Sequence, residues 1–469
     1  MVLSSITTAI ALFAIFRFTA ELLTVKWIGA WSLVQGLFLV ARVSDSGAGS
    51  NISRVIAVRV KDGTGLDLRN FTIASLIIAS IPSILLTMIS APIIGLYVTA
   101  QFSSELGSDG LHAIVWLALL NSVIASVSNI LLAICEGVYQ LNYKSIVIIF
   151  GNFAGVIALL PLLQLAGPAG IGWVYVTISG TQLIFAAIRV SQLVRSQPTV
   201  QSAMIRQHIR ILWRENFHLS GIALIRLSFE PVTKLLLSLF APLLVIAQFE
   251  LALRVTTQIR IVIQSALQPL LVLGARAHAD AHASLKEVFL RNDRILSWLS
   301  LGVLVAQILA SPAIQWLGTG SHEKIFIVFF AFLAGGNAVN TMGISGYYWQ
   351  LTSGLLSPLV RIQAVMAAIN VSLGVLGRAL GSPILVVAAY SAAFMFGGLS
   401  SRSFLREISR ISMILSTFLI IVGGGLTTGL VLLLHPASPT AICILLVGAV
   451  AAAGICLYSV YQTTRRSSS

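Results

Sequence analysis

Ten ionisable residues stand inside segments of the chain that are otherwise long and apolar. They are Arg17, Glu21, Arg42, Asp45, Arg226, Glu230, Lys234, Glu250, Arg254 and Arg260. Three opposite-charge pairs among them are spaced i, i+4 and a fourth is spaced i, i+3, so each pair shares one face of a helix. An ionised side chain at the centre of a bilayer costs at least about 2.5–3.5 kcal/mol. The sequence therefore predicts that these residues face a polar cavity or one another.

Cations outnumber anions among these residues by six to four, and five of the six cations are arginines. Arginine keeps its charge in proteins, and its planar guanidinium can bind two oxygens of a phosphate at once. A water-filled cavity with surplus positive charge predicts an anionic substrate. The predicted substrate-binding residues are Arg17, Arg42, Arg226 and Arg254, and the predicted ion-coupling or charge-pairing residues are Glu21, Asp45, Glu230 and Glu250. Lys234 and Arg260 form a further group, because their long side chains can also extend to the membrane interface.

Salt bridges offer a purely structural alternative for the same residues. In that interpretation, opposite charges neutralise one another and hold neighbouring helices together. The sequence leaves both interpretations open.

Membrane-spanning helices are the elements that must position these residues. Of the 469 residues, 57% are hydrophobic and only 9% are charged, whereas soluble proteins carry about 25% charged residues. One crossing needs roughly 20 apolar residues. Such segments lie near 4–24, 31–52, 71–98, 111–135, 145–165, 170–188, 216–240, 243–271, 295–316, 325–347, 359–379, 382–400, 411–434 and 441–462. The predicted fold is an all-α polytopic membrane protein with about 14 transmembrane helices.

Loop charges predict the topology of these helices. With the amino terminus in the cytoplasm, most of the 29 lysines and arginines, Lys144 and Arg402 among them, fall in cytoplasmic loops. Only Lys26, Lys324 and Arg378 fall in loops on the outer side. This asymmetry follows the positive-inside rule, and an even number of spans places both termini in the cytoplasm. We attribute the net charge of +14 to loops that meet anionic membrane lipids, and we expect no nucleic-acid partner.

The predicted domain organisation has two lobes of six helices. The first lobe covers residues 1–190, a cytoplasmic linker covers 191–215, and the second lobe covers 216–400. Residues 401–469 supply two extra transmembrane helices and a cytoplasmic tail. Charge pairs in the first two spans are echoed in the seventh and eighth, which favours a pseudo-twofold repeat of the kind common in secondary transporters.

Enzymatic motifs are missing from the sequence. It contains no GxxxxGK[ST], HExxH or GxSxG pattern, and we expect no direct ATP hydrolysis. The longest outer loop, near 99–110, is short and carries few acidic residues. We therefore expect a protein that is not an enzyme and needs no cofactor and no metal.

Several short motifs resemble those of the O-antigen-type polysaccharide flippases. The segment Trp27-Ile-Gly-Ala-Trp-Ser-Leu, followed by residues 45–57, resembles their first two helices. The turn Cys135-Glu136-Gly137 resembles a Glu-Gly-x-x-Arg turn, with Gln140 or Leu141 where a basic residue is usual.

The seventh and eighth spans extend this resemblance. Glu230-Pro-Val-Thr-Lys234 is similar to an Asp-x-x-x-(Arg/Lys) start, and Phe249-Glu-Leu-Ala-Leu-Arg254 is similar to a Tyr-x-x-Ala-x-(Arg/Lys) segment. The chain departs from the family in its shorter first outer loop and in Glu230, where Asp is commoner.

The resemblance implies a polysaccharide transporter of the multidrug, oligosaccharidyl-lipid and polysaccharide exporter superfamily. Such a protein has a V-shaped pair of six-helix lobes in the bacterial cytoplasmic (inner) membrane and works by alternating access. Its substrate would be a lipid-linked oligosaccharide on undecaprenyl pyrophosphate, used in lipopolysaccharide O-antigen assembly beside a polysaccharide polymerase and chain-length proteins. The diphosphate suits the surplus of arginines.

Three other functions remain open at this stage. An ion-coupled multidrug or cation extruder of the same superfamily would need carboxylates in excess, whereas here the basic residues outnumber the carboxylates within the spans. A membrane-embedded polysaccharide polymerase, ligase or glycosyltransferase would need catalytic residues on a sizeable loop. A flippase for another anionic lipid, such as the peptidoglycan precursor, is compatible with every feature of the sequence.

Overall fold

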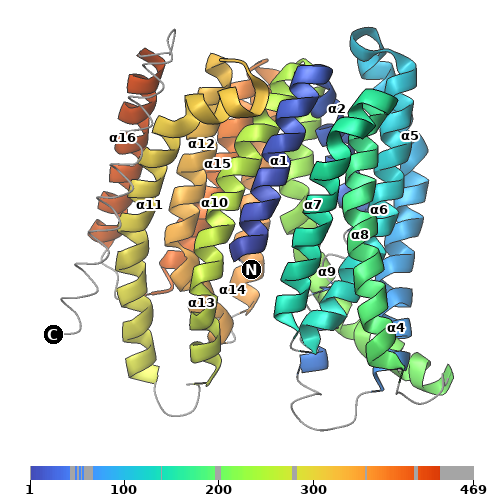
Figure 1. Cartoon of the computed structure of the whole chain (residues 1–469). Helices are drawn as coiled ribbons and strands as arrows, with labels where there is room; N and C mark the ends of the chain where they lie inside the picture. The colour runs from blue at the N-terminus through green and yellow to red at the C-terminus, as the bar shows by residue number, and fades with distance from the viewer. Residues whose placement is uncertain are drawn as a thin grey trace. The chain divides into compact units, whose positions relative to one another are not determined.

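A computed structural model shows that the chain is helical throughout its described residues (Figure 1). These residues are 2–42, 48–49, 52–53, 55–57, 67–138, 140–195, 202–276, 282–353, 356–405 and 410–433. No strand is present within these ranges. By packing, the chain divides into two compact units, Met1–Ser238 and Leu239–Ser469, which we call unit 1 and unit 2.

Unit 1 is built mainly from long helices. Its elements are α1 (Val2–Leu22), α2 (Val25–Ala41), α4 (Leu68–Ser75), the π-helical turn η1 (Leu76–Ser80), α5 (Ile81–Leu106), α6 (Ser108–Gly137), α7 (Leu141–Ala166), α8 (Pro168–Val194) and α9 (Ser202–Ser238). Gly107 and Gly167 make the tight turns before α6 and α8 at φ values of 78° and 53°, which other residues rarely adopt. Within this unit α8 packs against both α6 and α7 (Figure 1).

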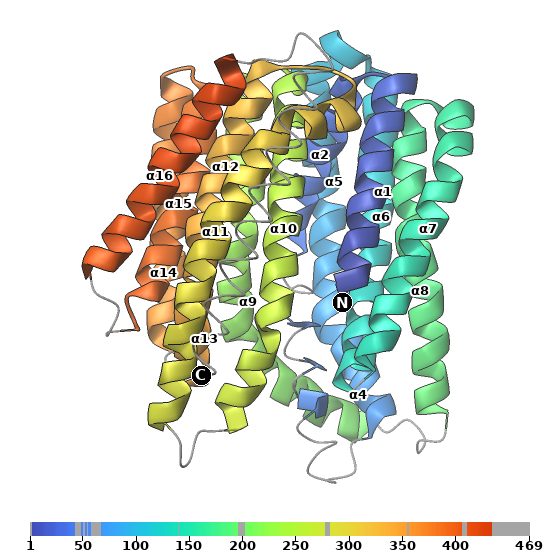
Figure 2. The same ribbon diagram turned by 60° about the vertical axis from the view of Figure 1, so that its left-hand side comes forward.

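Unit 2 has the same construction. Its elements are α10 (Leu243–Arg276), α11 (His282–Thr319), α12 (Lys324–Met342), α13 (Ile344–Thr352), α14 (Leu356–Ala379), α15 (Pro383–Arg402) and α16 (Arg410–Leu433). Helix α12 packs against α11, α15 and α16, and these four helices run alongside one another in Figure 2. The backbones of α12 and α15 approach so closely that a Cβ added at Gly343 would overlap the carbonyl oxygen of Gly398. Small residues at such crossings are typical of helix packing in membranes.

The helices confirm a polytopic all-α membrane protein. Ten helical segments of the described chain are long and apolar enough to cross a bilayer, and α2 is a shorter apolar helix. Helices α9 and α10 occupy two further predicted spans, and they carry all six of the intramembrane charges predicted for the second half of the chain. The last predicted span, 441–462, lies outside the described residues.

Helix α9 begins within the predicted linker. Residues 202–215 form its first turns, and apolar side chains at helical spacing pack this stretch onto α4. Helix α9 also packs against α2, so it groups with unit 1, whereas the sequence assigned residues from 216 onward to the second lobe. The predicted lobes and the pseudo-twofold between them stay a prediction.

Candidate functional site

Among the described cations of unit 1, Lys234 is the most deeply buried, with no exposed side-chain surface. Its Nζ donates to Oε1 of Glu230 at 2.5 Å, one turn earlier on α9, and to the backbone carbonyl of Ser32 on α2 at 3.2 Å. Gly36 makes this contact possible, since a Cβ there would lie 3.1 Å from Cδ of Lys234. Lys234 therefore bonds α9 to α2 instead of extending to the membrane interface.

Arg17 and Glu21 form the expected i, i+4 ion pair on α1. The Nη2–Oε1 distance is 3.0 Å, and the two side chains are 33% and 53% exposed. Both groups therefore keep much of their surface open, and the pair contributes little to stability.

Three other predicted residues of unit 1 are described in part or not at all. Arg42 is the partly buried residue that ends α2. Asp45 lies outside the described residues, and so does the side chain of Arg226 on α9. The ion pair that the structure gives to Glu230 is with Lys234, which matches the acid and base of the resemblance motif.

Glu250 and Arg254 form an ion pair of a different character on α10 of unit 2. Nε of Arg254 donates to Oε1 of Glu250 at 2.7 Å. The carboxylate side chain is 5% exposed, whereas the arginine side chain is 35% exposed. At a rise of 1.5 Å per residue, Arg254 stands about 16 Å along α10 from Leu243, which is near half the thickness of a bilayer core. A buried carboxylate thus orients an accessible guanidinium deep in a membrane-spanning helix.

Arg260 lies farther along α10 and contacts two other helices of unit 2. Its Nη1 donates to Oδ1 of Asn340 on α12 at 3.3 Å, and its guanidinium lies 5.0 Å from the ring centroid of Phe394 on α15. Asn340 in turn donates from Nδ2 to the carbonyl of Phe394 at 3.2 Å. These contacts orient the Arg260 guanidinium in the same unit as Arg254.

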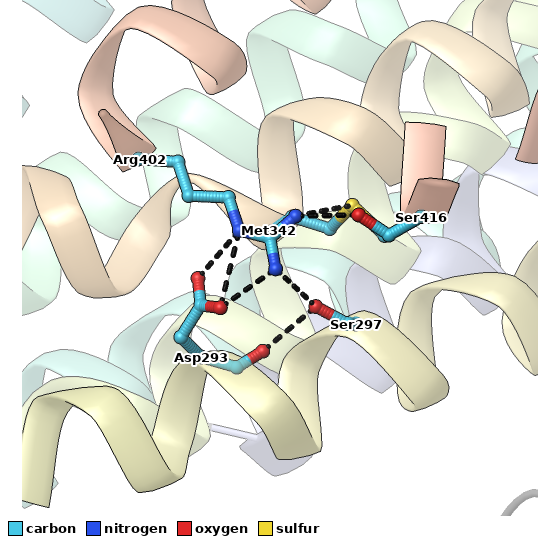
Figure 3. A network of polar contacts seen from close by, with 5 residues as sticks. All are labelled: Asp293, Ser297, Met342, Arg402 and Ser416. Atoms are coloured by element: carbon cyan, nitrogen blue, oxygen red, sulfur yellow. Dashed lines mark hydrogen bonds and ion pairs between the residues drawn. The ribbon is translucent and has the colours of Figure 1, made fainter. Parts of the chain in front are cut away.

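Figure 3 shows a charge cluster that local sequence patterns did not predict and that has the most hydrogen bonds of any within the described residues. Arg402, predicted as a loop residue, is 3% exposed at the end of α15 and pairs with Asp293 of α11, which is 5% exposed. Its Nη2 donates to Oδ2 of Asp293 at 2.7 Å and to Oγ of Ser297 at 2.9 Å, while Nη1 donates to Oγ of Ser416 on α16 at 2.7 Å. Met342 of α12 also touches the guanidinium. No local spacing signals this pair, because its members are 109 residues apart.

A second missed cluster orders the turn between α6 and α7. Lys144 pairs with Glu136 at 2.5 Å across this turn. Gln140 accepts a hydrogen bond from Nε of Arg189 at 2.9 Å, and Arg189 also lies over the ring of Tyr143. Glu136 thus has a basic partner in Lys144, beyond residues 140 and 141 where the resemblance expects a basic residue.

The predicted cationic residues are therefore distributed over both units. Arg17 and Lys234 belong to unit 1, and Arg254 and Arg260 belong to unit 2. A single shared cavity for Arg17, Arg42, Arg226 and Arg254 stays a prediction. Within the described part of the chain, no group of three His, Cys, Asp or Glu side chains is arranged to hold a metal ion.

Comparisons with known proteins support the fold. No protein-family model matches the chain, and no curated protein matches it. The structure is similar to that of a multidrug resistance MATE family transporter of the MOP superfamily, with a TM-score of 0.68 and 15% identity over 88% of this chain and 94% of that one. It is equally similar to the lipid II flippase MurJ, with a TM-score of 0.68 and 13% identity over 98% of this chain and 99% of that one.

A third similar structure is VcmN, a MATE transporter from Vibrio cholerae. The TM-score is 0.52, with 14% identity over 90% of this chain and 98% of that one. At these identities the likeness shows that the chain has the fold of these membrane proteins.

Proposed function

We propose that this chain is an alternating-access flippase of the bacterial cytoplasmic membrane whose substrate is a lipid-linked oligosaccharide carrying a diphosphate. The observation that carries the proposal is the Glu250–Arg254 pair on α10. A guanidinium this far along a spanning helix does not face lipid, because its insertion there is too costly. It needs a polar path, and a polar path through the membrane with a fixed cation on its wall suits an anion.

The geometry of the pair favours binding over simple neutralisation. Glu250 accepts from Nε of Arg254, which is the nitrogen nearest the backbone. This contact orients the side chain, and its 35% exposure gives the guanidinium accessible surface for contact with phosphate oxygens. Arg260 lies on the same helix as Arg254, and its guanidinium is oriented by Asn340 of α12 and Phe394 of α15. We assign it to this path as the second cation.

The fold supports a lipid-linked cargo and also admits an alternative. The structural likeness extends over nearly the whole length of a lipid II flippase, so a peptidoglycan precursor is one candidate cargo and an O-antigen precursor on undecaprenyl pyrophosphate is another. Both carry a diphosphate next to a polyprenyl chain. A polysaccharide polymerase and chain-length proteins would be partners only in the O-antigen case.

The second candidate function is an ion-coupled multidrug or cation extruder. The observation in its favour is the equal likeness to a multidrug resistance transporter, together with the accessible carboxylate of Glu21. In such a protein the carboxylates would bind the cation and the arginines would only balance them.

Replacing Arg254 and Glu250 singly and together tests the main proposal. We expect Arg254→Gln to reduce transport roughly 10- to 100-fold, because the substrate loses a charge-assisted hydrogen bond that contributes about 1.5–3 kcal/mol. Arg254→Lys keeps the charge without the planar fork and should retain part of the activity. The double variant Glu250→Gln with Arg254→Gln should stay inactive, because the anion still lacks its donor.

The assay is surface display of glycan in a bacterial strain that lacks its own flippase, with the membrane level of each variant measured by blot. The matched control is Lys26→Gln with Glu105→Gln, which removes the 3.3 Å ion pair between the ends of α2 and α5. This control should transport normally. Recovery of transport in the double variant of Glu250 and Arg254 would make the pair structural. Export of a cationic dye that depends on Glu21 but not on Arg254 would favour the extruder.

A further inference from the structure

The first turns of α9, residues 202–213, form an amphipathic segment at the end of unit 1 where α4 begins (Figure 1). One face of this segment packs on the unit. The inward residues are Ile205, His208, Ile209 and Leu212. Leu212 is fully buried, and the ring of His208 lies edge-on to Phe71 of α4 with centroids 5.5 Å apart. The segment is therefore anchored on the protein along one side only.

The exposed surface of the segment combines positive charge with apolar groups. Arg206 and Arg210 are both exposed and stand one turn apart. Trp213 is 59% exposed and Met204 is 41% exposed. Among the described residues, neither arginine forms an ion pair. Asp67, the acidic residue at the start of α4, accepts a hydrogen bond from the backbone N–H of Asn70 and caps that helix.

This combination of groups matches the chemistry of a membrane interface. Amphipathic helices that lie in the headgroup layer carry Lys or Arg on the polar face and Trp, Phe or Leu toward the acyl chains. Tryptophan favours this depth because its ring is apolar and its N–H is polar. The segment lies where the apolar spans of unit 1 end, so the layer next to it is the headgroup region of one leaflet. An acidic protein partner would account for the arginines but not for the exposed Trp213 and Met204.

We propose that residues 202–213 are an interfacial helix that binds the headgroups of anionic lipids through Arg206 and Arg210, with Trp213 inserted at the acyl boundary. Residues one turn apart on a helix face are about 5–6 Å apart at Cβ, which lets the two guanidiniums contact one headgroup or two adjacent ones. The inference is independent of the cargo, because it concerns a surface at the end of the unit and not the charges on α10. Lipid bound here would stabilise the start of α9, the helix that carries Glu230 and Lys234.

Fluorescence quenching of the full-length chain in detergent micelles tests the proposal. The probe is phosphatidylglycerol with brominated acyl chains, and brominated phosphatidylcholine is the neutral comparison. The difference in quenching between the native chain and Trp213→Phe gives the signal of Trp213 apart from that of the other tryptophans. We expect phosphatidylglycerol to saturate this signal at a much lower mole fraction than phosphatidylcholine.

Each arginine near an anionic surface multiplies the association constant roughly fivefold, so Arg206→Gln with Arg210→Gln should weaken phosphatidylglycerol binding roughly 30-fold. Arg206→Lys with Arg210→Lys should stay within a few-fold of the native chain, because surface attraction depends on charge. Arg378→Gln removes one exposed cation from the end of α14 and is the matched control, with less than a twofold change expected.

Two results would overturn the proposal. Equal saturation by the anionic and the neutral lipid would mean that the surface does not recognise headgroup charge. Unchanged phosphatidylglycerol binding in the double Gln variant, at an unfolding temperature equal to that of the native chain, would mean that the arginines serve another partner, such as an acidic protein. A loss of binding in the double Lys variant as large as in the double Gln variant would count against charge in the same way.

Discussion

Unit 2 contains two arginine–carboxylate pairs that share their chemistry and differ in their surroundings. Arg402 and Asp293 join two helices, both side chains are buried, and the guanidinium has partners on three of its sides (Figure 3). Arg254 and Glu250 lie one turn apart on a single helix, and only the carboxylate is buried. The first pair stabilises the packing of α11, α15 and α16, whereas the second holds an accessible guanidinium on α10.

This difference shows that ion-pair geometry alone does not reveal function in a membrane protein. The accessible surface of the arginine is the feature that separates the two pairs. A guanidinium whose donors are all occupied by protein groups cannot bind a substrate without first breaking its own contacts. The Arg254 side chain is 35% exposed, so its guanidinium keeps accessible surface at which a substrate oxygen can bind.

The largest effect should follow from Arg402→Ala. The change leaves the carboxylate of Asp293 buried without its cation, which costs about 3–5 kcal/mol. We expect low membrane levels and a strongly reduced unfolding temperature in detergent. Replacement of both residues, Arg402→Met with Asp293→Leu, should recover most of the lost stability. A stable, abundant Arg402→Ala protein with impaired transport would instead assign Arg402 to the transport path.

Reversal of the local pair should affect transport more than stability. Glu250→Arg with Arg254→Glu keeps an ion pair on α10 but puts the carboxylate at the exposed position. Transport should fall roughly 10- to 100-fold, since an anion now meets a carboxylate in place of a charge-assisted donor. The membrane level should match that of the native chain by blot. Retained transport would show that the order of the charges is irrelevant and that the pair is structural.

Replacement of Lys234 should reduce stability less than replacement of Arg402 and more than reversal of the pair on α10. Its side chain is fully buried and bonds α9 to α2, but its partner Glu230 is 20% exposed and can recover some hydration. Lys234→Met should therefore reduce the free energy of unfolding by about 1.5–3 kcal/mol, less than Arg402→Ala. Chemical denaturation followed by tryptophan fluorescence measures the change. A loss equal to that of Arg402→Ala would mean that burial of the carboxylate does not set the size of the effect.

The smallest effect should come from the exposed pair on α1. Arg17→Gln with Glu21→Gln removes an ion pair of side chains that are 33% and 53% exposed. Exposed pairs at this spacing contribute about 0.3–0.5 kcal/mol, so the unfolding temperature should barely change. A transport defect in this variant at native stability would place Arg17 or Glu21 on the substrate or ion path.

The motifs carried by the charged spans allowed part of the site to be predicted. The i, i+4 spacing of Arg17 with Glu21 and of Glu250 with Arg254 predicts pairs that the structure contains. The same rule pairs Glu230 with Arg226, whose side chain lies outside the described residues. The structure gives Glu230 an ion pair with Lys234, which is four residues away in the other direction and is buried where α9 packs against α2.

The sequence by itself determined the class of the protein and the helices that carry charge. Long apolar runs require a bilayer, and helical spacing follows from local geometry alone, so both can be read without the fold. Only the tertiary structure decided which charges are buried and which are accessible. Arg402 reads as a loop residue because its carboxylate is 109 positions away, and residues 202–213 read as a linker because their buried face needs α4. Burial depends on contacts between distant segments, and no local pattern encodes them.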